Sequence, residues 1–259
     1  MYLTWFDGNS WLLEIGNQSI LLDPWLVGNL VFGDAEWFFK GSRPQEHAIP
    51  AQIDLILLSQ GLPDHAHKPT LQQLDHQIPV VASPTAAKVV QELGYTSITS
   101  LTFGESFTLN NQVEIQAVRG STVGYNLVEN GYLITELTSG LKLYYEPHGN
   151  HSPEIKQFAP VDVLIVPIID ITLPIVGPFI KGKIQALELS QWLQPQVILP
   201  TTASKDLIYE GFLGKLQNPE GTIEEFRSLL KQNNLAPQVM ETTPGDRLEV
   251  KLQKRALAI

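Results

Sequence analysis

The chain contains no cysteine among its 259 residues. This absence excludes disulfide bonds, thiolate-held iron–sulfur clusters and a cysteine nucleophile. A metal ion could be held only by histidine, carboxylate or carbonyl groups.

Basic residues are also scarce, with 17 Lys and Arg against 27 Asp and Glu, which gives a net charge of −10. An acidic surface repels phosphate backbones, so we expect no nucleic-acid partner. The sequence has neither a phosphate-binding glycine loop nor a dinucleotide-binding fingerprint. A small-molecule substrate or ligand is the expected partner.

Long hydrophobic runs are lacking, with Val163–Ile180 as the nearest approach to a membrane span. Pro167, Asp170 and Pro174 interrupt this run, so it predicts a core strand that stops and no transmembrane segment. The residues Met1–Asp7 lack the basic and apolar regions of a signal peptide. We therefore expect a cytoplasmic location.

Two apolar segments without clear periodicity keep more than one interpretation. Residues 169–180, if exposed, could form a wall of an apolar pocket, a surface for a homo-oligomer or a membrane-surface contact; the alternative is a buried crossover. Residues 27–50 contain Trp37, Phe38 and Phe39, which could cover a site or fill a small satellite core.

The order of predicted elements favours a layered α/β or α+β protein, in one domain over residues 1–259. Two mixed β-sheets packed face to face with helices outside would satisfy this order. Strands are predicted at 2–6, 11–15, 19–22, 53–58, 79–82, 97–101, 106–109, 113–119, 125–128, 132–136, 141–145, 161–166, 196–199 and 248–252, and helices from 69, from 84, at 183–193 and at 222–232.

The loop Ser59–Thr70 joins the buried strand Ile53–Leu58 to a helix that begins near Pro69. It contains Asp64, His65 and His67. Loops between a strand and a helix carry chemistry because a rigid scaffold positions them where ligands can reach. This loop is therefore the leading candidate for a functional site.

Several segments, in order and spacing, resemble the metallo-β-lactamase-fold hydrolases, in particular the branch that includes sugar-phosphate lactonases. They are the hairpin Trp5–Trp25 with its Ile-Leu-Leu-Asp-Pro-Trp end, the strand and loop 53–65, Asn130–Ile134, Gly140–Tyr145, Val161–Pro167 and Val197–Pro200. The resemblance covers nearly the whole chain. It implies an αββα sandwich with the site at one edge.

The resemblance also implies two zinc-like ions, but the ligands of the first ion are missing. Two of its imidazoles would stand at Gln60 and Leu62, and the third in the turn Gly120–Gly124, and none of these positions holds histidine. The sequence therefore predicts a degenerate active site that binds at most one ion.

The second ion of the family keeps part of its ligand set. Asp64 and His65 match the family's motif, and Glu146 stands where the family usually has an Asp that bridges both ions. The final imidazole would follow the strand 197–200, where the chain has Thr201-Thr202, and a histidine of the first turn is replaced by Asn9.

We predict Asp64, His65, Glu146 and His148 as both metal ligands and catalytic residues around one divalent ion, either Zn, Mn or Fe. Structural roles for all four are the alternative. A metal-free site is also open, with His65 or His148 as a base and Ser121 or Thr122 as a nucleophile. The remaining histidines are assigned otherwise: His67 to a solvated or second-layer role, His151 to a surface helix start, and His47 and His76 to the surface.

Two functions follow from these residues and the resemblance. The first is metal-dependent hydrolysis of a small ester, lactone or phosphoester. The alternative is a non-catalytic, metal-free member of the family that binds a small ligand or a protein partner between the Trp37–Phe39 loop and the 169–180 segment.

Overall fold

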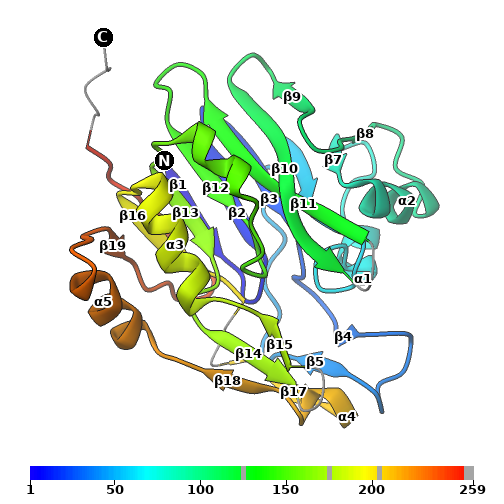
Figure 1. Cartoon of the computed structure of the whole chain (residues 1–259). Helices are drawn as coiled ribbons and strands as arrows, with labels where there is room; N and C mark the ends of the chain where they lie inside the picture. Colours follow the sequence, from blue (N-terminus) through cyan, green and yellow to red (C-terminus); the bar gives the residue numbers. More distant parts are fainter. Residues whose placement is uncertain (124–126, 174–176, 203–205, 254–259) are drawn as a thin grey trace.

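Two seven-stranded mixed sheets face each other in the computed structural model, which describes residues 1–123, 127–173, 177–202 and 206–253 (Figure 1). The first sheet has the order β20-β1-β2-β3-β6-β7-β8. Its strands are β1 (Tyr2–Trp5), β2 (Trp11–Ile15), β3 (Gln18–Leu22), β6 (Leu55–Leu58), β7 (Val80–Ala82), β8 (Ile98–Ser100) and β20 (Arg247–Glu249).

The second sheet has the order β19-β16-β13-β12-β11-β10-β9. Its strands are β9 (Ser106–Leu109), β10 (Val113–Val123), β11 (Leu127–Glu136), β12 (Lys142–Tyr145), β13 (Val163–Val166), β16 (Val197–Pro200) and β19 (Gln238–Val239). Each sheet has an antiparallel half and a parallel half; in the first, β3, β6, β7 and β8 run parallel.

Alternating apolar residues place the main core between the two sheets. In β2 the buried Trp11, Leu13 and Ile15 face the opposite sheet, where Tyr132 and Ile134 of β11 belong to the same core cluster. Successive strand residues point to opposite faces, so the intervening residues are free to face a helical layer.

Helices cover both outer faces, which completes the predicted αββα sandwich (Figure 1). Helices α1 (Lys68–Gln73) and α2 (Pro84–Glu92) pack on the first sheet through Leu71, Ala86 and Val90. Helices α3 (Lys183–Leu193) and α5 (Ile223–Gln232) pack on the second sheet, with a short 3₁₀ turn, η1 (Pro153–Phe158), beside α3.

Two small three-stranded sheets lie at one end of the sandwich, in the lower part of Figure 1. They are β15-β14-β18, with β14 (Asp170–Leu173), β15 (Gly177–Ile180) and β18 (Asn218–Glu220), and β17-β5-β4, with β4 (Leu30–Val31), β5 (Lys40–Ser42) and β17 (Ile208–Glu210), followed by the short helix α4 (Gly211–Gly214).

These sheets contain the two segments that had no clear pattern in the sequence. Residues 169–180 form a hairpin of β14 and β15 that pairs with β18. The hairpin lies in the crossover between the parallel strands β13 and β16, and Ile171 and Ile180 are buried, as one of the interpretations expected. Residues 174–176 lie outside the part that the structure describes. Across the described ranges, we find no helix with both the length and the apolar character that a membrane crossing needs.

Candidate functional site

The loop that follows β6 lies at the carboxyl end of the parallel strands β3, β6 and β7. It ends at His67, whose Nδ1 accepts the backbone N–H of Thr70 as the N-cap of α1. The His67 Nε2–H donates to the carbonyl of Asn29 at 3.1 Å. His67 is 2% exposed, so the predicted solvated role is wrong and this histidine instead fixes the start of the helix.

A buried carboxyl group, Asp23, anchors this loop from the end of β3. Its Oδ1 accepts the backbone N–H of Ser59 at 2.7 Å, and its Oδ2 accepts the Tyr145 hydroxyl at 2.7 Å. The same Oδ2 lies 2.7 Å from His65 Nδ1. Asp23 thus connects both sheets to the loop that follows β6. Sequence analysis did not assign it a role, although it stands in the Leu-Leu-Asp-Pro-Trp segment on which the resemblance rested.

His65 lies between two carboxyl groups. Its Nδ1 faces Asp23, and its Nε2 lies 3.1 Å from Oδ2 of Asp64. Burial lowers the pKa of His65, but the charges of Asp64 and Asp23 outweigh it and raise the pKa to about 10. Burial likewise raises the pKa of Asp64, and the charge of His65 outweighs this and lowers it below its ordinary value.

This arrangement predicts a fall in stability at alkaline pH for the metal-free protein. The pKa of His65 is about 10 when folded and 6.5 when free, so its charged form contributes fully below pH 6.5 and is lost as the pH rises toward 10. Urea unfolding in the presence of a chelator measures this. His65→Gln should flatten the decline between these two pH values; an equally steep decline in the variant would contradict the assignment.

His148 approaches His65 from the turn after β12. The two rings meet edge to face with centroids 5.1 Å apart, and the Gln60 side-chain nitrogen lies 3.2 Å from His148 Nδ1. Burial and the neighbouring charge of His65 lower the pKa of His148 to about 3. His148 is therefore a neutral imidazole, the form that can ligate a metal or accept a proton.

Three of the four predicted site residues come together as possible ligands. One side-chain atom each from Asp64, His65 and His148 lies within 4.8 Å of the others. Glu146 is not in this group of described residues. It is fully buried, and its Oε2 accepts the backbone N–H groups of His148 and Asn150, at 3.2 and 2.8 Å, which shapes the turn that carries His148.

Two positions that replace family histidines, Asn9 and Thr202, hydrogen-bond to each other. The Thr202 hydroxyl lies 3.0 Å from Asn9 Oδ1 and 2.9 Å from the carbonyl of Pro147. The Thr201 hydroxyl donates to Gly8 O at 2.9 Å. The side chains of Ser121 and Thr122, which were considered as nucleophiles, lie outside the described part of the chain.

An apolar cavity of about 260 Å³ opens beside Asp64. Six aromatic residues contribute to its wall. Among the described residues that line it, Asp64 is the only acidic one, and none is Lys or Arg. Its lining residues are Gly8, Asn9, Trp25, Leu30, Phe32, Phe38, Phe39, Asp64, Ile171, Phe179, Ile180, Thr202, Tyr209, Leu213 and Gln217. The prediction that 169–180 forms a wall of an apolar pocket is confirmed by Ile171, Phe179 and Ile180.

No histidine is among the described residues that line this cavity. Three histidines, His151, His47 and His76, also lie outside the ligand group. His151 was predicted at a surface helix start, but its side chain is 0% exposed and its Nε2 lies 2.9 Å from Glu188 Oε2. His47, predicted at the surface, lies 3.1 Å from Asp7 and is only 15% exposed. His76 stacks on Tyr95 with ring centroids 4.5 Å apart. Each of these histidines has a local structural partner.

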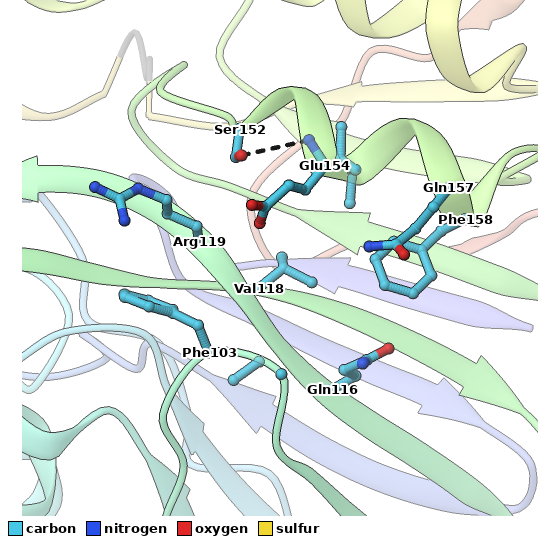
Figure 2. Close-up of a pocket in the computed structure, with 11 residues that line it drawn as sticks. Phe103, Gln116, Val118, Arg119, Ser152, Glu154, Gln157 and Phe158 are labelled. Carbon is cyan, nitrogen blue, oxygen red and sulfur yellow. Dashed lines mark hydrogen bonds between the residues drawn. The ribbon is translucent and has the colours of Figure 1, made fainter.

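A second cavity, of about 80 Å³, lies between β10 and η1 (Figure 2). Figure 2 shows Phe103, Val118 and Arg119 on one side and Glu154 with Phe158 on the other. None of the predicted site residues lines it, and its polar groups include a local cap in which Ser152 Oγ accepts the Glu154 backbone N–H at 3.3 Å. Of the predicted site residues, Asp64 lines the larger of these two cavities, and none lines the smaller one.

Comparison with known proteins agrees with this fold. Residues 2–202 match the model of the family described as the beta-lactamase superfamily domain. An isothiocyanate hydrolase from gut bacteria of Delia radicum is 16% identical, with a TM-score of 0.67 over 98% of this chain and 100% of that one. A metallo hydrolase from Ignicoccus hospitalis is 17% identical, with a TM-score of 0.66 over 96% and 99%.

A diiron β-hydroxylase from Streptomyces venezuelae is also similar, at 15% identity and a TM-score of 0.67, over 96% of this chain and 54% of that one. At identities this low, the similarity concerns the fold and not the activity. The family match covers more than half of the chain, and both sheets and their helical layers agree with the fold. The chain therefore belongs to the β-lactamase superfamily and has the metallo-β-lactamase fold.

Proposed function

We propose that the chain hydrolyses a small, uncharged ester or lactone at Asp64, His65 and His148, with at most one divalent ion. The observation that carries this proposal is the position of Asp64, which lies in the wall of an apolar cavity and in the three-residue ligand group at once. A lining without Lys or Arg favours a neutral substrate over the phosphoester that the sequence left open.

The donor set of this chain fits a single ion. Two buried acceptors on the loop, Gln60 Oε1 and Asp64 Oδ1, have no hydrogen-bond partner among the residues that the structure describes. Carboxyl groups also outnumber protonated imidazoles around Tyr145. Burial and then the charges of Asp23, Glu146 and Asp64 raise the pKa of Tyr145, whereas the one protonated imidazole beside these carboxyl groups is His65. A buried surplus of acceptors and negative charge favours a bound cation.

Asp64, His65 and His148 would hold the ion, and Zn, Mn or Fe each suits this mixed oxygen and nitrogen set. Such an ion lowers the pKa of bound water and so supplies a hydroxide near neutral pH. His65 must release the proton on Nε2 to ligate, so loading competes with its ion pair to Asp64.

The protein's own groups have defined tasks in this proposal. Asp23 holds His65 in place through Nδ1, and Glu146 holds the turn that presents His148. Tyr209 lines the cavity, and burial followed by the charge of Asp64 raises the pKa of its hydroxyl, which therefore remains a donor. We assign to this hydroxyl a hydrogen bond to the carbonyl oxygen of the substrate. The aromatic walls exclude bulk water from the reacting group.

The test combines metal analysis with turnover of an aryl ester, a lactone and a phosphodiester by the same preparation. Asp64→Asn and His148→Ala are each expected to lower ester or lactone hydrolysis by about 10²–10⁴-fold. His76→Ala, outside the site, is the matched control and should leave the rate unchanged. An unchanged rate in both site variants, or turnover of the phosphodiester alone, would contradict the proposal.

A non-catalytic role is the second candidate, favoured by the replacement of the first ion's ligands by Gln60 and Leu62. In that case the cavity binds an apolar ligand and His65 keeps its ion pair with Asp64. Protein that binds a neutral apolar ligand, contains no stoichiometric metal after incubation with Zn, Mn or Fe, and turns over none of the three substrates would support this second function.

A further inference from the structure

One wall of the cavity is built where α4 meets the loop before β5, because Leu213 and Phe38 both line it. The backbone N–H of Leu213 donates to the carbonyl of Phe38 at 2.8 Å, and the N–H of Phe212 donates to the carbonyl of Trp37 at 2.9 Å. These two bonds clip the helix to the loop and fix the four side chains in register.

The side chains of these four residues point in two opposite directions. Phe38 and Leu213 line the cavity. Trp37 and Phe212 do not line it, and they are 76% and 62% exposed. A methyl group on Gly211 would lie 2.8 Å from Glu36 O, so the start of α4 packs against the backbone of the loop before β5 without room for a side chain. Phe38 and Leu213 therefore form the cavity side of this wall, and Trp37 and Phe212 form its exposed side.

The cavity also has polar residues in its lining. Asp64, Asn9 and Thr202 line the same space as Phe38 and Leu213. An uncharged carbonyl compound would accordingly place its reacting group at Asp64 and its apolar group among the aromatic rings. The length of that apolar group is limited by whatever wall it meets.

We propose that the substrate carries a linear or aryl apolar group of limited length and that Leu213, with Phe38, sets this limit. The inference rests on the proposed function for the identity of the reacting group, but the length limit is a property of the cavity. Leu213 is a specificity-determining residue in this scheme and takes no part in the reaction.

The test uses methyl alkyl ketones, which keep the carbonyl group and cannot be hydrolysed, with binding followed by calorimetry. In the wild-type protein, affinity should rise about fourfold per added methylene and then level off at a defined chain length. Leu213→Ala should move that limit outward by about two methylene groups, because it removes a comparable volume from the wall. Leu213→Trp should move it inward.

Phe212→Ala is the matched control. It removes a larger apolar side chain from the preceding residue of the same helix, and that side chain lies on the exposed side of the wall. Its limit should equal that of the wild-type protein. An unchanged limit in both Leu213 variants, or an equal shift in Phe212→Ala, would overturn the inference. Should Leu213→Ala fail to fold, Leu213→Trp alone decides the question.

The two proposals fail in different ways. Ketone binding with a length limit that Leu213 controls, together with no turnover of any ester or lactone, would uphold this inference and sink the proposed hydrolysis. Ester hydrolysis with no dependence on chain length in either binding or turnover would do the reverse.

Discussion

Asp23→Ala is expected to lower the free energy of unfolding by about 3–5 kcal/mol. The Asp23 carboxyl group is 0% exposed and accepts bonds from the Ser59 backbone, the His65 ring and the Tyr145 hydroxyl. Its removal takes the acceptor away from these three donors and from the Ser59 hydroxyl, and each buried donor left unpaired costs about 1–3 kcal/mol. Urea unfolding followed by tryptophan fluorescence measures the change.

Tyr145→Phe provides the scale for this experiment. It removes one donor from Asp23 and keeps the aromatic ring in the core between the sheets, so its expected cost is about 1 kcal/mol. Asp23→Asn keeps the shape of the side chain and loses its charge, and should fall between the two. A cost for Asp23→Ala no greater than that for Tyr145→Phe would show that Asp23 is not the anchor of the loop.

Elements with strong local signals could be predicted from the sequence. The helix at 183–193 was predicted with the bounds that the structure has, because its apolar residues Ala186, Leu189 and Leu193 recur at helical spacing. The hairpin between β9 and β10 was predicted from Asn110 and Asn111, which both adopt a positive φ that asparagine tolerates. Both features depend on residues close together in the chain.

Elements made by distant pairing could not be predicted in this way. Strand β17 exists because Tyr209 pairs with Gly41, far along the chain, and residues 208–210 have no strand pattern of their own. The same holds for the cavity, whose wall joins residues from the loop 30–39, the hairpin 170–180 and the segment 202–217. Sequence periodicity reports burial and says little about which distant segment provides the partner.

The site was predicted in part for the same reason. Asp64 and His65 follow a recognisable strand and loop. His148 lies 88 residues beyond its contact Gln60 and was placed with them only through the order of segments in the family resemblance. Glu146 was predicted as a ligand from its place after a strand; in the structure its Oε2 accepts two backbone N–H groups of the turn. A carboxylate's position in the sequence does not reveal whether nearby backbone donors already occupy it.

The second large effect on stability is expected in the turn after β12 that carries His148. Gly149→Ala is expected to lower the free energy of unfolding by about 3 kcal/mol or more, with loss of the His148 position. Gly149 has φ of 74°, and a Cβ there would lie 1.5 Å from the carbonyl oxygen of Lys181, so the two backbones would have to separate. The bond from Lys181 N to His148 O, at 3.0 Å, would be broken with them.

Gly140 offers a control that isolates the clash from the backbone strain. It has the same φ of 74°, but a Cβ would meet nothing within 4 Å. Gly140→Ala should therefore cost only the left-handed conformation of a residue with a side chain, about 1–2 kcal/mol. The difference between the two variants measures how tightly the segment before α3 holds the His148 turn. Equal costs would mean that the turn moves freely, and that His148 is not fixed beside His65 by its backbone.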